Sequence, residues 1–154
     1  MFQPFVHDQV ICLAAPALAI FGSDGQVRGI GAQGVYVADR RVLRMLVLRV
    51  CGEEPEPISC VLTGPGAARV VSVYRSGDEP TPDPVVILEQ VRDMRTLKEQ
   101  LSVRNRGRHP VTLDLDMEVA ADFAPTFVIK MGDRSPACLP SLVPAGMRFH
   151  GSAG

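Results

Sequence analysis

Apolar and polar residues alternate over two segments between Leu97 and Phe123, one on each side of a turn at 105–110. In the first segment Leu101 and Val103 lie on a parity that is apolar apart from Glu99. Side chains at i and i+2 share a face in a strand but not in a helix. Each segment is therefore predicted to be a strand with one buried and one wetted face. Asn, Gly and Pro in the turn favour an antiparallel hairpin with a loop of about three or five residues.

A row of carboxylates lies on the second of these segments. Asp114, Asp116 and Glu118 alternate with apolar residues, which places neighbouring carboxyl groups roughly 6–7 Å apart. That separation overlaps the spacing of the acid pair in inverting glycosidases. Catalytic acids normally sit in a cleft where burial raises one pKa, whereas this row falls on the wetted face. We therefore expect a solvated row, paired across the hairpin with Lys98 and Arg104, and no catalytic residue here.

Short apolar runs bounded by turn signals predict strands along the rest of the chain, and no segment has a helical period of credible length. The further strands are expected at 10–14, 18–21, 26–30, 34–51, 58–63, 68–75 and 85–95. The segment 34–51 is apolar on both faces over much of its length, which predicts a strand inside a sheet or under a partner domain. The polar segment 76–84 is expected to be a solvated connection.

The predicted fold class is all-β, an antiparallel β-sandwich formed by residues 1–130. Residues 131–154 contain repeated Gly and Pro breaks and no sustained period. They are predicted to be an irregular tail or truncated last strands. If they are truncated strands, the sandwich is incomplete at its C-terminal end.

Charge and composition narrow the function classes. The chain has 154 residues, 16 basic and 17 acidic, with a formal net charge of −1, and the two signs are interleaved. No basic patch therefore indicates nucleic acid. No apolar run approaches the length of a membrane span and no signal peptide is convincing, so we expect a cytoplasmic protein without a membrane partner.

Metal and cofactor sites are not predicted. The four cysteines have no CxxC or Cys/His ligand spacing, and most lie in apolar runs, so free buried thiols in a reducing compartment are expected. Gly29, Gly31 and Gly34 have the spacing of a dinucleotide fingerprint, but a strand-like segment follows them where that fingerprint requires a helix. We expect no metal ion and no cofactor.

Charged residues interrupt apolar segments at two places, and together with Phe123 they are the candidate binding or domain-interface residues. Asp39 and Arg41 lie within 34–51, and Asp122 precedes Phe123 at the end of the second alternating segment. A charge in such a place marks a bend, a buried pair or a contact surface. Pairing of Asp39 with an arginine inside the domain and contact with a ligand or another domain are both open, and the same two readings apply to Asp122.

Three patches of the sequence resemble the N-terminal domain of bacterial glycogen-debranching-type enzymes, the amylo-α-1,6-glucosidase relatives. Together they cover about residues 18 to 130. The patches are Ser23-Asp24 and Gln26 with Gly34-Val35-Tyr36-x-x-Asp39-x-Arg41-x-Leu43; Leu101-Ser102-Val103-Arg104-Asn105 with Pro110-Val111; and Glu118-x-x-Ala121-Asp122-Phe123-Ala124 leading to Phe127.

The resemblance implies a β-sandwich that precedes an (α/α)-barrel glycoside hydrolase domain, whose catalytic carboxylates lie in the barrel. This chain is then a non-catalytic accessory domain of a longer polypeptide in carbohydrate metabolism, with the barrel as its partner. Two departures concern polar contacts: Arg40 stands where the family has Thr, and Pro125 and Val128 stand where it has acids.

Two other functions stay open. One is a free-standing module that binds an α-glucan, which sandwich modules usually do with exposed aromatic side chains. The chain has no Trp, two Tyr and six Phe, which does not favour it. The other is self-association into a homo-oligomer through exposed strand edges.

Overall fold

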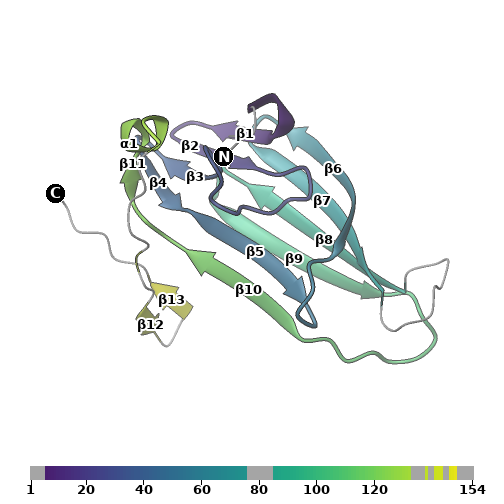
Figure 1. Ribbon diagram of the computed structural model, residues 1–154. Helices are drawn as coiled ribbons and strands as arrows, with labels where there is room; N and C mark the ends of the chain where they lie inside the picture. Colours follow the sequence, from purple (N-terminus) through teal and green to yellow (C-terminus); the bar gives the residue numbers. More distant parts are fainter. Residues whose placement is uncertain (1–5, 76–84, 133–137, 139–140, 144–145, 149–154) are drawn as a thin grey trace.

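The computed structural model describes residues 6–75, 85–132, 138, 141–143 and 146–148, and its regular secondary structure is almost entirely β-strand (Figure 1). The predicted solvated connection at 76–84 and much of the predicted tail lie outside the described residues. The strands are β1 (Val10–Ala14), β2 (Ala17–Phe21), β3 (Gly34–Val37), β4 (Arg40–Leu43), β5 (Met45–Val50), β6 (Glu56–Gly64), β7 (Ala67–Tyr74), β8 (Val86–Asp93), β9 (Lys98–Asn105), β10 (Leu115–Ala120), β11 (Ala124–Pro125), β12 (Ser141–Val143) and β13 (Gly146–Arg148). The helical segments are a 3-10 turn, η1 (Val6–Asp8), and α1 (Thr126–Lys130).

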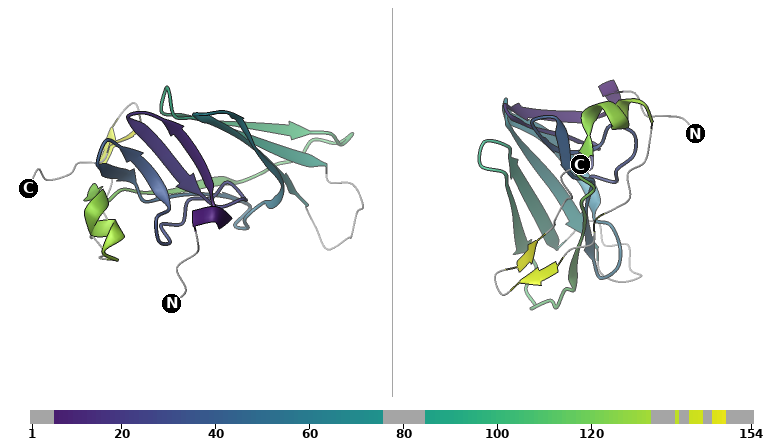
Figure 2. Two further views of the ribbon diagram at one scale, coloured as in Figure 1. Left: turned by 90° about the horizontal axis from the view of Figure 1, so that it is seen from above. Right: turned by 90° about the vertical axis from the view of Figure 1, so that its left-hand side faces the viewer.

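These strands form two layers, which confirms the predicted antiparallel β-sandwich (Figure 2). The second layer is the sheet β6-β7-β8-β9. The first layer contains the sheet β1-β2-β3-β4-β11 and the pair β10-β5. These two parts are continuous, because the Arg44 amide between β4 and β5 donates to the carbonyl of Ala120 at 2.8 Å. In the C-terminal segment, β12 pairs with β13, and Cys138 forms a bridge with Ala121.

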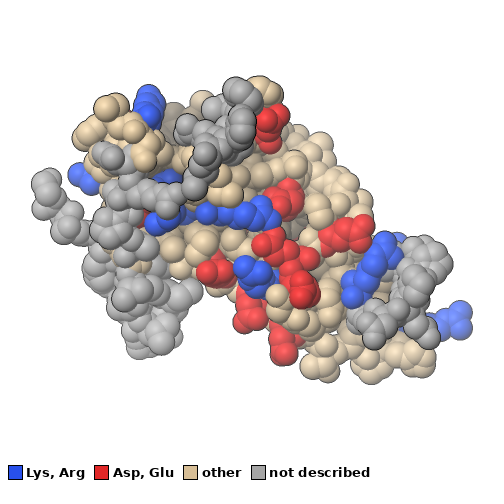
Figure 3. Space-filling view, viewed as in Figure 1, with Lys and Arg blue, Asp and Glu red and all other residues tan. Residues whose placement is uncertain are grey.

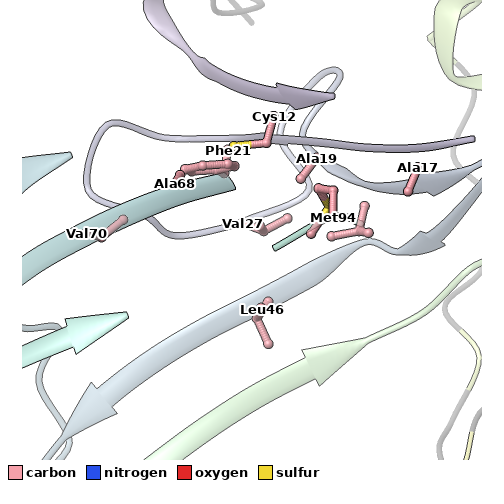
Figure 4. Packing of buried hydrophobic residues seen from close by; sticks show 10 residues of the cluster. Cys12, Ala17, Ala19, Phe21, Val27, Leu46, Ala68, Val70 and Met94 are labelled. Carbon is pink, nitrogen blue, oxygen red and sulfur yellow. The ribbon is translucent and has the colours of Figure 1, made fainter. Parts of the chain in front are cut away.

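The core lies between the two layers. Phe21 and Cys12 of the first layer pack in one buried cluster with Ala68 and Val70 of the second (Figure 4). A second cluster joins β5 to β8, formed by Leu48, Val50, Val86 and Leu88. Burial of alternate residues on β8 follows the period of two that predicted this strand.

The predicted hairpin between Leu97 and Phe123 is wrong, although both of its strands exist. β9 pairs along its length with β8, and β10 pairs with β5, so the two strands belong to different layers. The residues between them form a long connection, and the second strand begins at Leu115 and not near Val111. Alternation determines which face of a strand is buried but not which strand pairs with it.

The segment 34–51 forms three strands in place of one. A turn at Ala38 and Asp39 separates β3 from β4, and Ala38 has a positive φ of 52°. In β5, the apolar last third, one face is buried at Leu46, Leu48 and Val50, whereas on the other face Val47 is buried and Met45 and Arg49 are half-buried.

Residues 26–30 were expected to form a strand, but only Val27 forms a β-bridge, with Leu46. Beside this bridge, the side chain of Gln26 forms the two hydrogen bonds with β5 that the backbone of a strand would otherwise form. Its Nε2 donates to the carbonyl of Leu48 at 3.1 Å, and the Leu48 amide donates to its Oε1 at 3.0 Å. A buried primary amide thus satisfies the edge of β5 as a neighbouring strand would.

We predict that Gln26→Ala lowers the free energy of unfolding by about 1–3 kcal/mol, because it leaves a buried donor and acceptor of Leu48 unpaired. Gln26→Glu retains the shape and the acceptor but places an oxygen against the Leu48 carbonyl, so it should also destabilise. Urea unfolding followed by circular dichroism measures both. Gln100→Ala, on an exposed position of β9, is the control and should change the value by less than about 0.5 kcal/mol. Equal stabilities of all four proteins would contradict this role for Gln26.

Candidate functional site

A buried ion pair joins two of the residues that the sequence singled out. Arg41 lies on β4, and Asp122 lies between β10 and β11, where the pairing of Ala124 with Arg41 brings the two segments together. The Arg41 Nε lies 3.2 Å from each carboxylate oxygen of Asp122, and Nη2 also donates to Oδ2. Only 5% of Arg41 and 7% of Asp122 is exposed. This is a bidentate guanidinium–carboxylate contact, which fixes the relative orientation of the two side chains in addition to pairing their charges.

Backbone groups complete the hydrogen bonding of this pair. The Arg41 Nη1 donates to the carbonyl of Gln33 at 3.2 Å, and the amide of Ala124 donates to the Asp122 Oδ1 at 3.3 Å. Tyr36 lies in the adjoining cluster with Ala124, and its hydroxyl donates to the carbonyl of Ala32 at 2.7 Å. Burial raises the pKa of Tyr36 above its ordinary value, and the positive charge of Arg41 partly opposes that rise.

Asp39 and Phe123 lie at the outer side of the same junction. Asp39 is exposed in the β3–β4 turn, and its carbonyl accepts from the Thr126 amide at 2.8 Å. Phe123 is half-buried with a φ of 50°, and its carbonyl accepts from the Arg40 Nη1 at 3.1 Å. All four candidate residues are therefore brought together at one end of the first layer. The arginine partner is Asp122, however, and not Asp39.

A short helix beside this junction was missed by the sequence analysis. α1 follows β11 and buries Ile129 against Tyr36 and Ala124, while Phe127 is 68% and Met131 79% exposed. We call the pair Phe127 and Met131 the α1 knob. Their i, i+4 spacing is the signal that was available, but one turn of helix is too short for periodicity to reveal. Figure 3 shows the surface of α1 as mostly uncharged, with basic side chains around it.

The row of acids is solvated, as predicted, but its expected partners are wrong. Asp114, Asp116 and Glu118 are exposed. Asp116 lies opposite Arg49 of β5, and the Arg49 Nη2 is 3.5 Å from the Glu118 Oε2. Lys98 and Arg104 lie on β9 in the other layer, because the predicted hairpin does not form.

The thiols and the described acids form no metal centre. The four cysteines are free; Cys12 is buried, Cys60 and Cys138 are half-buried, and Cys51 is exposed, which corrects the expectation of burial for Cys51. Burial raises the pKa of both Cys12 and Cys60. In the part of the chain that the structure describes, no group of three His, Cys, Asp or Glu side chains is placed to hold a metal ion, and no helix is long and apolar enough to cross a membrane.

Residues 14–148 match a family model described as the N-terminal domain of some glycogen debranching enzymes. The chain belongs to this family. The match confirms the resemblance and extends beyond residue 130, through β12 and β13. It includes both members of the ion pair, so the Arg41–Asp122 junction and α1 are parts of this debranching-enzyme N-terminal domain. No curated protein and no solved structure matches the chain.

We predict that Asp122→Ala lowers the free energy of unfolding by about 3–5 kcal/mol, because Arg41 is left buried without its counter-charge. Asp39→Ala, a carboxylate removed from the exposed turn nearby, is the matched control and should cost less than about 0.5 kcal/mol. Chemical denaturation of the two variants measures both values. Adding Arg41→Met to Asp122→Ala should recover part of the loss. A double variant as unstable as the sum of its single variants would contradict a direct coupling.

Tyr36 should make the domain less stable in alkali. Because its pKa in the folded chain is raised above the value of 10.0, the unfolded chain loses the phenolic proton first as the pH rises. Its contribution is fully present below about pH 10 and declines as the pH rises above that value. Tyr36→Phe has no such proton, so its stability should fall less steeply between about pH 9 and 11. Parallel slopes for the two proteins in denaturant unfolding would contradict this assignment.

Proposed function

We propose that this chain is a non-catalytic accessory domain that supports carbohydrate processing by a partner (α/α)-barrel hydrolase domain of a longer polypeptide. Membership of the debranching-enzyme N-terminal family is the observation that carries the proposal. Among the described residues, the one row of acids that resembles a hydrolase pair lies exposed on β10 and the residue just before it. A general acid needs a partly desolvated position to keep its proton at neutral pH, and this row does not provide one.

The surface that meets the partner domain is, in this proposal, the end of the sandwich around Asp39, Phe123 and the α1 knob. Exposed apolar side chains with a polar rim are typical of protein–protein contacts. Here Phe127 and Met131 provide the apolar part, and Asp39 and Arg40 the rim. The buried Arg41–Asp122 pair then acts indirectly, by holding β11 and α1 against β4.

Direct binding of an α-glucan is less well supported. Among the described aromatic residues, Phe127 alone is exposed; Phe21 and Tyr36 are buried, and Tyr74 and Phe123 are half-buried. A sugar platform usually needs aromatic faces at a concave surface. Calorimetric titration of this chain with maltooligosaccharides should show no binding at about micromolar concentration.

The first test is enzymatic. The 154-residue chain should release no glucose from an α-1,6-branched oligosaccharide, whereas the polypeptide encoded by its complete reading frame should. A reading frame without a hydrolase domain, or hydrolysis by this chain alone, would count against the proposal.

The second test addresses the surface. In the longer polypeptide, Phe127→Ser combined with Met131→Ser should lower kcat/KM for the branched substrate about 5- to 30-fold, the equivalent of about 1–2 kcal/mol of lost contact. Both side chains are largely exposed, so the unfolding of the isolated 154-residue chain should hardly change. Val111→Ser, another exposed apolar residue in a distant loop, is the control and should retain full activity. An unchanged kcat/KM in the double variant would remove this surface from the proposal.

A further inference from the structure

The sheet β6-β7-β8-β9 ends in a long apolar edge strand. β6 pairs with β7 on one side, and no strand lies beyond it in Figure 1. Along it Ile58, Val61 and Leu62 are 56%, 51% and 53% exposed. Every second backbone amide and carbonyl of an edge strand points away from its sheet, so such an edge can accept another strand.

The other edges of the two main sheets are protected in ways that β6 is not. β9 carries Lys98, Glu99 and Arg104, β1 is short, and β11 has only two residues and leads directly into α1. Charge, shortness and cover are the usual devices that prevent edge-to-edge pairing. β6 has no charged residue after Glu56, its first position. The ends of β6 do carry two such devices, Pro57 and shifts of its register with β7, so the unprotected part is the middle of the strand, whose register is regular from Ser59 to Leu62.

We propose that β6 pairs antiparallel with β6 of a second copy of this chain, joining two four-stranded sheets across a two-fold axis. Antiparallel pairing of a strand with itself places uncharged residues opposite uncharged residues. With the axis near Cys60, Ile58 of each copy lies opposite Leu62 of the other. An isologous contact of this kind closes on itself and forms a dimer, not a fibre.

Neighbouring charges do not oppose this contact. Glu56 accepts from the Arg75 Nε at 3.0 Å, and Arg69 on β7 forms two hydrogen bonds with Glu89, at 2.7 and 3.1 Å. The charges nearest to β6 are therefore neutralised within each copy. Two identical edges can approach without a row of like charges facing each other, which would otherwise cost several kcal/mol.

The length of β6 sets the expected strength. Nine residues at about 3.4 Å each extend over roughly 30 Å, and one strand pair with its adjoining side chains lies at the small end of stable interfaces. We therefore expect a dimer that dissociates in the micromolar range, roughly −8 kcal/mol. The contact is independent of the function proposed above, because α1 lies on the other side of the molecule from β6 (Figure 1).

Analytical ultracentrifugation of the 154-residue chain over a range of concentrations tests the dimer. Val61→Glu should raise the dimer dissociation constant about tenfold or more, because with the axis near Cys60 the two new carboxylates are diagonal neighbours, about 7–8 Å apart, and repel each other. Within its own chain this residue lies opposite Arg69, so the variant should fold normally, which circular dichroism checks. Ile58→Glu provides a second variant at the same edge. Val103→Glu, an exposed valine on β9, is the control and should dimerise as the parent does.

Hydrogen exchange locates the contact. Amides of residues 58–63 should exchange more slowly as the protein concentration rises, whereas amides of β9 should not change. A strict monomer at every concentration, open-ended association, or a dimer that Val61→Glu and Ile58→Glu leave unchanged would each overturn the proposal.

Discussion

The buried contact between Arg41 and Asp122 holds β11, the edge strand of the first layer, in place beside β4. β11 has only two residues, and one of them, Pro125, has no amide to donate to β4. The backbone ladder alone therefore holds this segment weakly. Two side-chain contacts and one further backbone bond support it: the ion pair, the Arg40 bond to the Phe123 carbonyl, and the Thr126 amide bond to the Asp39 carbonyl. Desolvation cancels much of the Coulomb energy of a buried pair, so its main effect here is to specify one register.

A second buried arginine has the same role between the layers. Arg92 on β8 forms two hydrogen bonds with Glu99, at 2.7 and 3.0 Å, and one with the Gly25 carbonyl at 3.1 Å. Its guanidinium carbon also lies 4.3 Å from the centre of the Phe21 ring. A cation over an aromatic face in a desolvated place contributes about 2 kcal/mol. Charged residues thus bind the loop at Gly25 and strand β2 to the opposite sheet, where aliphatic packing alone would leave their relative position less defined.

The sequence was sufficient for those features that depend on one strand at a time. β1 begins and ends where the apolar run predicted, and β6, β7 and β8 agree within two residues. The partner of each charged or polar side chain could not be predicted in the same way. Glu99 was the exception on an otherwise apolar parity, and only the three-dimensional structure shows that Arg92 neutralises it. Likewise the charges at 39, 41 and 122 indicated an unusual place, but not that Arg41 reaches a carboxylate 81 residues away. The structural role of Gln26 was missed because its side-chain amide takes the place of a backbone amide and carbonyl, and the hydrophobic period of a sequence carries no signal for such a contact.

Two exposed features of the domain differ in what they can bind. The α1 knob consists of side chains on a helical turn, and any apolar surface of suitable shape can cover side chains. The open edge of β6 consists of backbone donors and acceptors, and only an extended segment can satisfy these in a regular row. A folded helical barrel has no free strand to add to β6 but does have apolar surface to place on α1. A second copy of this domain has a matching strand. The chemistry of each surface therefore suits the two proposals differently: the proposed barrel partner fits α1, the proposed second copy fits β6, and neither proposal depends on the other.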